Sequence, residues 1–188
     1  MSLSRLLASE KSPILDKWFD LILSTYSADA APFFRSKGTF TNPVGHTISQ
    51  GIEDIFDGLA SGTPLVQYRP FLDNIIRVRA VQDFTASTAV AFVFHLKTAI
   101  RAACLKKIAA QGLYDELLAM ELRIDELSLM AFDIFMQCRE KLYDLKANEL
   151  RDRTLWILKR SGYLTEVEDE PGIMPGERMN DKPTKEVN

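Results

Sequence analysis

The feature that most constrains this chain of 188 residues is a run from Leu113 to Arg160 that contains neither glycine nor proline. Its apolar residues recur at alternating steps of four and three, which is the pattern of a helix that packs along its length in a bundle or a coiled coil. One helix over the whole run would be about 70 Å long, whereas a compact domain of this size is roughly 40 Å across. The helix therefore has to bend, break or project.

This apolar seam predicts a homodimer, because it is longer than a compact monomer can readily cover. A projecting helix of this kind can carry a signal or bind a partner. Besides Ala131 and Cys138, the seam consists of the residues that we take as interface candidates: Leu117, Met120, Ile124, Leu127, Ile134 and Leu145.

The earlier part of the chain also predicts helices, with recognisable start and stop signals. Ser12 followed by Pro13 is the sequence of a helix cap and first turn, and Asn42 followed by Pro43 repeats it. Thr85 can cap a later helix, and Gly112 separates that helix from the long final run. Since no segment alternates with a period of two, we predict an all-α, single-domain helical bundle with a long C-terminal helix.

Charge is distributed unevenly along the chain. The formal net charge is −3, yet the segment from residue 162 to 188 alone holds seven acidic and three basic residues. The preceding part is therefore nearly neutral and lacks the basic field of a nucleic-acid-binding protein. Because the acidic segment can bury little apolar surface, we predict a helical domain over residues 1–161 and a disordered tail over residues 162–188.

The two cysteines, Cys104 and Cys138, form neither a Cys-x-x-Cys pair nor a disulfide framework, and buried, unreactive thiols are expected. The first ten residues do not resemble a signal peptide, and no stretch has eighteen consecutive apolar residues. We therefore expect a cytoplasmic protein that neither crosses nor inserts into a membrane.

The sequence shows none of the common catalytic or zinc-binding motifs, so we assign no catalytic residue, no metal ligand and no cofactor. Several carboxylates in the final run could share a helix face, as in a carboxylate di-metal enzyme. Such sites also use Glu-x-x-His pairs, which this chain lacks, so a solvated face is the better interpretation. These carboxylates are Glu121, Asp125, Glu126, Asp133 and Glu140.

His95 lies in an apolar segment, Phe92 to Leu96, that would suit a haem or a small apolar molecule. An ordinary core or edge histidine is the simpler interpretation, because no partner that would orient a ligating imidazole is visible. Polar residues also interrupt strongly apolar helices, where burial is costly unless they find partners. They could form a shared buried network or pair at the surface, and they are Arg79, Gln82, Asp83, Asp133 and Arg139.

Four segments, taken in order and spacing, resemble one known family, the RsbRD N-terminal domains. The resemblance covers roughly residues 6–160. The segments are Asn42-Pro43-Val44-Gly45, Arg77 to Phe84, Ala89 to Lys97 and Ala131 to Lys141.

These domains are similar to the N-terminal sensor modules of RsbR-type co-antagonists of RsbT in the stressosome, which controls a general stress response. The resemblance implies a helical, globin-like, dimeric and non-catalytic module for sensing or protein interaction. The relatives continue into a STAS domain that meets partner proteins, whereas this sequence continues into the acidic segment. We expect a regulatory module in signal transduction. The alternatives are a sensor that binds haem or another small molecule, an accessory protein of another complex, and a carboxylate di-metal enzyme.

Overall fold

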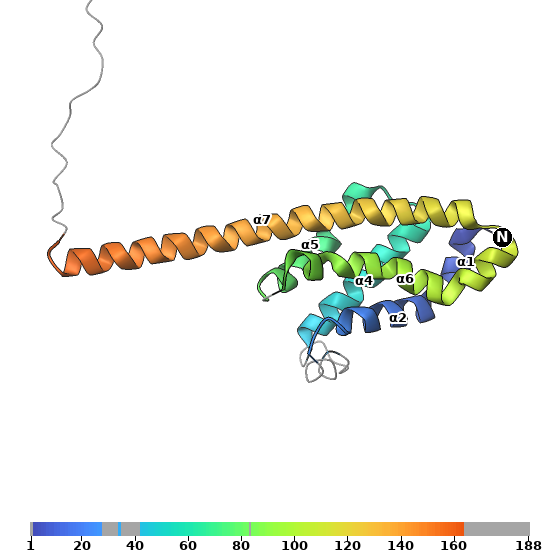
Figure 1. Ribbon diagram of the computed structural model, residues 1–188, viewed down its shortest axis with the longest axis horizontal. Helices are drawn as coiled ribbons and strands as arrows, with labels where there is room; N and C mark the ends of the chain where they lie inside the picture. The colour runs from blue at the N-terminus through green and yellow to red at the C-terminus, as the bar shows by residue number, and fades with distance from the viewer. Residues whose placement is uncertain (1, 28–33, 35–41, 83, 164–188) are drawn as a thin grey trace, which may run out of the picture. The chain divides into compact units, whose positions relative to one another are not determined.

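The computed structural model describes residues 2–27, 34, 42–82 and 84–163, and these residues form helices without any strand. The prediction of an all-α protein with a long C-terminal helix is confirmed (Figure 1). The helices are α1 (Leu3–Ser9), α2 (Lys11–Leu23), α4 (Pro43–Ser61), the 3-10 helix η1 (Leu65–Tyr68), α5 (Arg69–Ala80), α6 (Ala86–Gln111) and α7 (Tyr114–Arg160).

The chain divides into two compact units, Met1–Ala147 and Asn148–Asn188. The first unit contains α1 to α6 and most of α7, and the second begins inside α7. The predicted tail over residues 162–188 lies, from residue 164 onward, outside the described residues. The α7 element itself runs from Tyr114 to Arg160 without a break.

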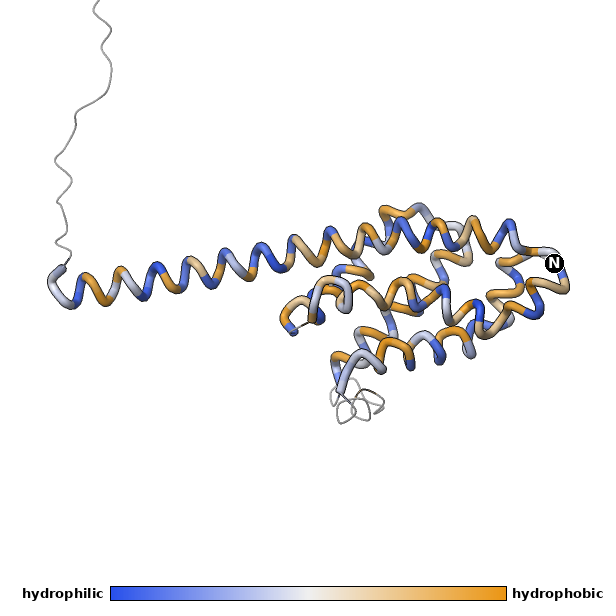
Figure 2. Tube along the Cα trace, viewed as in Figure 1, coloured by the Kyte–Doolittle hydropathy of each residue, from blue (hydrophilic) through white to orange (hydrophobic). Residues whose placement is uncertain are grey.

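The core of the first unit is built around α6, which packs against α1, α2 and α5, while α4 packs against α1, α2 and α5. Trp18 of α2 is fully buried and donates its indole N–H to the carbonyl oxygen of Phe92 at 2.6 Å, which ties α2 to α6. Figure 2 shows apolar and polar residues alternating along α7, as expected of a helix that buries one face.

Helix α6 is long and apolar enough to cross a membrane by length and composition alone. It is instead the central helix of the first unit, and its buried residues include Phe92, Val93 and Ile100. The apolar character predicted around Ala86 to Leu96 thus serves packing between helices.

Most of the predicted helix boundaries follow from local chemistry and are present. The Asn42 side chain accepts a hydrogen bond from the amide of Gly45 at 2.8 Å, and Pro43 is the first residue of α4. Thr85 caps α6 by accepting from the amide of Thr88 at 3.2 Å. Gly112, with a φ of 64°, ends α6 in the left-handed conformation that glycine adopts without strain.

The predicted start of the first long helix was wrong. The chain is already helical from Leu3, and α2 starts at Lys11, so Ser12 and Pro13 lie inside its first turn. Ser12 bonds to the Asp16 side chain at 3.5 Å instead of capping the helix. Buried Leu3, Leu6 and Leu7 anchor α1 in the core, a tertiary effect that the local cap pattern does not reveal.

Candidate functional site

The apolar seam chosen from the sequence is mainly part of the core, not of the surface. Its residues up to Ile134 belong to the buried face of α7, whereas Cys138 is half-buried and Leu145 is 66% exposed. The assignment of those up to Ile134 as interface residues is therefore corrected, because their apolar side chains already pack inside a single chain. The buried interface candidates are Leu117, Met120, Ile124, Leu127 and Ile134.

A second apolar stripe follows the opposite side of α7, and we call it the outer face. Its side chains are between 39% and 67% exposed. At 100° per residue they fall within a sector of about 80°, centred roughly opposite Ile134. Four of them are spaced seven residues apart, the repeat of one coiled-coil position. The outer face consists of Leu118, Leu122, Leu129, Phe132, Met136 and Tyr143.

The outer face was not predicted from the sequence, because both apolar stripes of α7 obey the same steps of four and three. The outer face is shifted by two residues along the helix from the buried stripe. The recurrence of large apolar residues at 122, 129, 136 and 143 was the signal that could have revealed it.

Charged residues flank the outer face asymmetrically. One side carries an exposed acidic row, Glu126, Asp133 and Glu140. The other side carries Arg139 and the exposed Lys146, together with Glu121 and Asp125, which pair with Arg101 and Lys97 of α6. Arg139 donates to the carbonyl oxygen of Ala80 at 3.2 Å and to the Tyr143 hydroxyl at 2.8 Å, so it also joins α7 to the end of α5.

In the second unit, the described residues are the end of α7 and the turn at residues 161–163. Leu150, Trp156 and Ile157 are exposed there, and the Arg160 guanidinium lies 5.1 Å from the centre of the Trp156 ring. In sequence, Leu150 and Ile157 continue the seven-residue spacing that ends in the first unit at Tyr143.

Arg79 is the centre of a buried polar cluster. Its guanidinium donates to the carbonyl oxygens of Thr88 and Ala89 at 3.0 Å, to the Thr25 hydroxyl at 3.0 Å and to the Tyr26 hydroxyl at 3.3 Å. Burial lowers the Arg79 pKa, and Tyr26 partly offsets that effect. The cluster therefore links α5 to α6 and to the end of α2.

The other polar candidates do not join Arg79 in one network. Asp133 is exposed, and Arg139 bonds to Ala80 and Tyr143. The Gln82 amide oxygen is buried without a hydrogen-bond partner among the described residues, and Asp83 lies outside them. The idea of one shared network of all five residues is thus corrected, because Asp133 on α7 is exposed and Arg139 on α7 bonds to Ala80 and Tyr143 instead of to Arg79 or its partners.

His95 is half-buried, and its Nδ1 has no hydrogen-bond partner among the described residues. Burial lowers the His95 pKa, and the nearby charge of Arg79 lowers it further, so the imidazole is neutral at pH 7. The pocket described next does not include His95.

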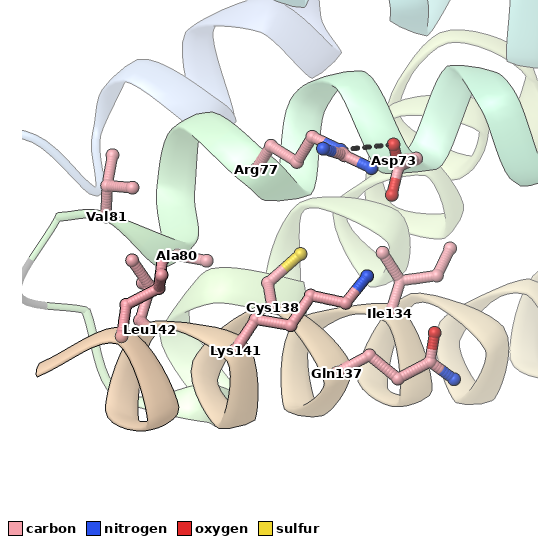
Figure 3. Close-up of a pocket in the computed structure, with 10 residues that line it drawn as sticks. Asp73, Arg77, Ala80, Val81, Ile134, Gln137, Cys138, Lys141 and Leu142 are labelled. Carbon is pink, nitrogen blue, oxygen red and sulfur yellow. Dashed lines mark hydrogen bonds and ion pairs between the residues drawn. The ribbon is translucent and has the colours of Figure 1, made fainter. Parts of the chain in front are cut away.

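A pocket of about 310 Å³ lies between α5 and α7 (Figure 3). Five apolar side chains, the Cys138 thiol and a group of four polar or charged side chains line it. That group is Asp73, Arg77, Gln137 and Lys141; Asp73 and Arg77 form an ion pair, and the Gln137 amide oxygen accepts from Arg69 at 2.8 Å. The apolar residues are Ala80, Val81, Ile134, Leu142 and Leu145.

Neither cysteine is arranged for nucleophilic chemistry. Cys104 is buried and Cys138 is half-buried, and both are free. Burial raises the pKa of each thiol; Asp73 raises that of Cys138 further, while Arg77 and Lys141 lower it. Both therefore stay protonated at pH 7 and act as apolar packing groups.

Two acidic residues of α7 pair with cations of α6. Glu121 accepts two hydrogen bonds from Arg101, at 2.7 and 2.8 Å, and Asp125 pairs with Lys97 at 2.6 Å. Both pairs join α7 to α6. Across the part of the chain that the structure describes, no group of three potential metal ligands occurs.

The chain matches one known protein family. Residues 12–150 match the family model described as the RsbT co-antagonist protein rsbRD N-terminal domain. No curated protein and no solved structure matches the chain. Because the match includes α2, α4, α5, α6 and most of α7, this chain belongs to the family of RsbT co-antagonist rsbRD N-terminal domains.

Proposed function

We propose that this chain is a non-catalytic sensory module in signal transduction that acts as a homodimer through the outer face of α7. The exposed apolar outer face is the observation that carries this proposal. The family description supports a regulatory role, and by analogy with it we place the protein in the cytoplasm, in a stress-response pathway with an output protein as partner.

A second copy of the chain is the occupant that best suits the outer face. Leu122, Leu129 and Met136 repeat every seven residues, and a straight stripe of this kind is matched by an identical stripe on another helix. An apolar surface along several helical turns is also costly to leave in water.

The flanking charges favour a parallel arrangement of the two helices. In an antiparallel pair related by a two-fold axis, the acidic rows at Glu126, Asp133 and Glu140 would face each other and repel. In a parallel pair, each acidic row faces the opposite side of the other helix. That side carries Arg139 and Lys146, as well as Glu121 and Asp125, whose charges are already paired with Arg101 and Lys97 of α6. A parallel dimer therefore places unlike charges together.

Sedimentation equilibrium at micromolar concentration tests the dimer. We expect about twice the chain mass of 21.3 kDa for the unaltered protein and the monomer mass for Leu129→Asp, because a charge at the centre of an apolar interface is costly. The matched control is Val66→Asp, which places the same charge at a residue of η1 that is 71% exposed. A monomeric unaltered protein, or a dimeric Leu129→Asp, would contradict the proposal.

The alternative function is a haem-binding sensor, favoured by the neutral His95, whose Nδ1 has no hydrogen-bond partner in the part of the chain that the structure describes. An absorption spectrum of protein purified with haem supplied separates the two. The sensory-module proposal predicts no Soret band in either the unaltered protein or His95→Gln. A band that His95→Gln loses would make haem the input.

A further inference from the structure

We propose that the pocket between α5 and α7 binds a small amphipathic anion, namely a monocarboxylate with a short apolar chain. Such a ligand would be an input for the sensory module, and in this regulatory sense the inference rests on the proposed function. Binding itself is a property of the first unit, which contains every residue that lines the pocket.

The size of the pocket sets the size of the ligand. About 310 Å³ lies at the lower end of the range for small-molecule sites, roughly 300–1,000 Å³. It corresponds to the space of about ten water molecules, and so to a ligand of about ten non-hydrogen atoms. Ala80 and Ile134 form a buried apolar part of the wall, while Val81 and Leu145 are exposed apolar residues of its open side.

The charges of the pocket select an anion. Arg77 and Lys141 contribute two positive charges and Asp73 one negative charge, so the lining is positive by one. Arg77 already forms an ion pair with Asp73, whereas Lys141 forms no ion pair with any of the described residues. Figure 3 shows the Lys141 side chain extended along α7, with its ammonium group in the part of the view that contains Ile134 and Asp73.

The structure around the pocket gives such a ligand a way to act. The lining of α7 at Ile134, Cys138 and Leu142 is on the helix side opposite the outer face. A ligand that joins α5 to α7 would favour one packing of these helices over another. The ligand can change the stability of the dimer only if its affinity differs between these two packings.

Isothermal titration of the full chain with octanoate tests the site. We expect saturable binding with a dissociation constant of a few millimolar or tighter, given a typical affinity per atom for small ligands. Octanol lacks the charge and acetate lacks the chain, so both should bind at least threefold more weakly. No saturable octanoate binding, or equal binding of octanol, would overturn the proposal.

Two variants locate the binding. Lys141→Gln should weaken octanoate binding about threefold or more, whereas Lys106→Gln, which removes the same charge from an exposed residue of α6 outside the pocket, should leave it unchanged. Equal weakening by both variants would show non-specific attraction and contradict the assignment. Since sedimentation without octanoate tests the dimer separately, a failure of the ligand proposal is distinguishable from a failure of the proposed function.

Discussion

At the scale of single residues, Arg79 is the side chain whose hydrogen bonds join α5, α6 and the end of α2. Its polar character within an apolar helix was visible in the sequence, but its partners were not. Thr25 and Tyr26 lie more than fifty positions earlier in the chain, and only the tertiary fold brings them to the guanidinium. The sequence thus indicates a polar residue that needs partners, but the partners depend on the tertiary fold.

Replacing Arg79 with Met should lower the free energy of unfolding by about 3 kcal/mol, because four buried or partly buried groups lose a charged hydrogen-bond donor. Urea denaturation measures this. Arg77→Gln, two residues away in the same helix but 65% exposed, is the control and should change stability by less than about 1 kcal/mol. Equal effects of the two substitutions would show that the buried cluster contributes no more to the free energy of unfolding than an exposed arginine does.

The Arg101–Glu121 pair predicts a dependence of stability on pH. Hydrogen bonding to Arg101 holds the Glu121 pKa below its ordinary value of 4.5, although burial opposes this. A carboxyl group whose pKa is lowered in the folded state stabilises the fold fully above its unfolded pKa, and that contribution disappears as the pH falls through its folded pKa.

Arg101→Gln should therefore lower the free energy of unfolding by about 1 kcal/mol at pH 7, and the difference from the unaltered protein should shrink below pH 4.5. Urea denaturation at several pH values checks this. The control Arg153→Gln removes a pair that is 3.9 Å apart and mostly exposed, so it should have little effect at any pH. A difference that grows on acidification would contradict the assignment.

At the scale of helices, the sequence predicts most of the structure that local chemistry determines. The Asn42 and Thr85 caps and the break at Gly112 were predicted correctly because each depends on neighbours within a few residues. The choice of interface on α7 was wrong because periodicity cannot tell which of two apolar stripes the domain buries. Burial depends on where α5 and α6 pack.

The two stripes of α7 should respond differently to the same substitution. Leu127→Asp should prevent stable folding, since it places an unpaired charge at a fully buried position, with an expected cost above about 4 kcal/mol. Leu129→Asp should keep a cooperative thermal transition, because Leu129 is 67% exposed. Circular dichroism at submicromolar concentration compares them, and unfolding of both variants would show that the outer face also belongs to the core.

At the scale of the whole molecule, α7 would have two roles on two sides. Its buried side completes the core and lines the pocket with α5, and its outer face is the proposed contact with a second copy. The sequence predicted a dimer seam on this helix, while the pocket could not be predicted, because α5 and α7 are far apart in sequence. A ligand in the pocket and a partner on the outer face would then act on one helix from opposite sides.

The most direct test of the parallel dimer is disulfide formation at both ends of the outer face. Leu122→Cys and Tyr143→Cys are made separately, with Cys104 changed to Ala and Cys138 to Ser, and Lys141→Cys on the opposite side of α7 is the control. A disulfide requires Cα atoms within about 7 Å, and residues 122 and 143 are about 31 Å apart along the helix. In a parallel pair each residue therefore meets its own equivalent, whereas in an antiparallel pair at most one of them can.

We predict disulfide-linked dimers from Leu122→Cys and from Tyr143→Cys, and none from Lys141→Cys. Cross-linking of only one outer-face variant, or of the control alone, would contradict a parallel dimer through the outer face.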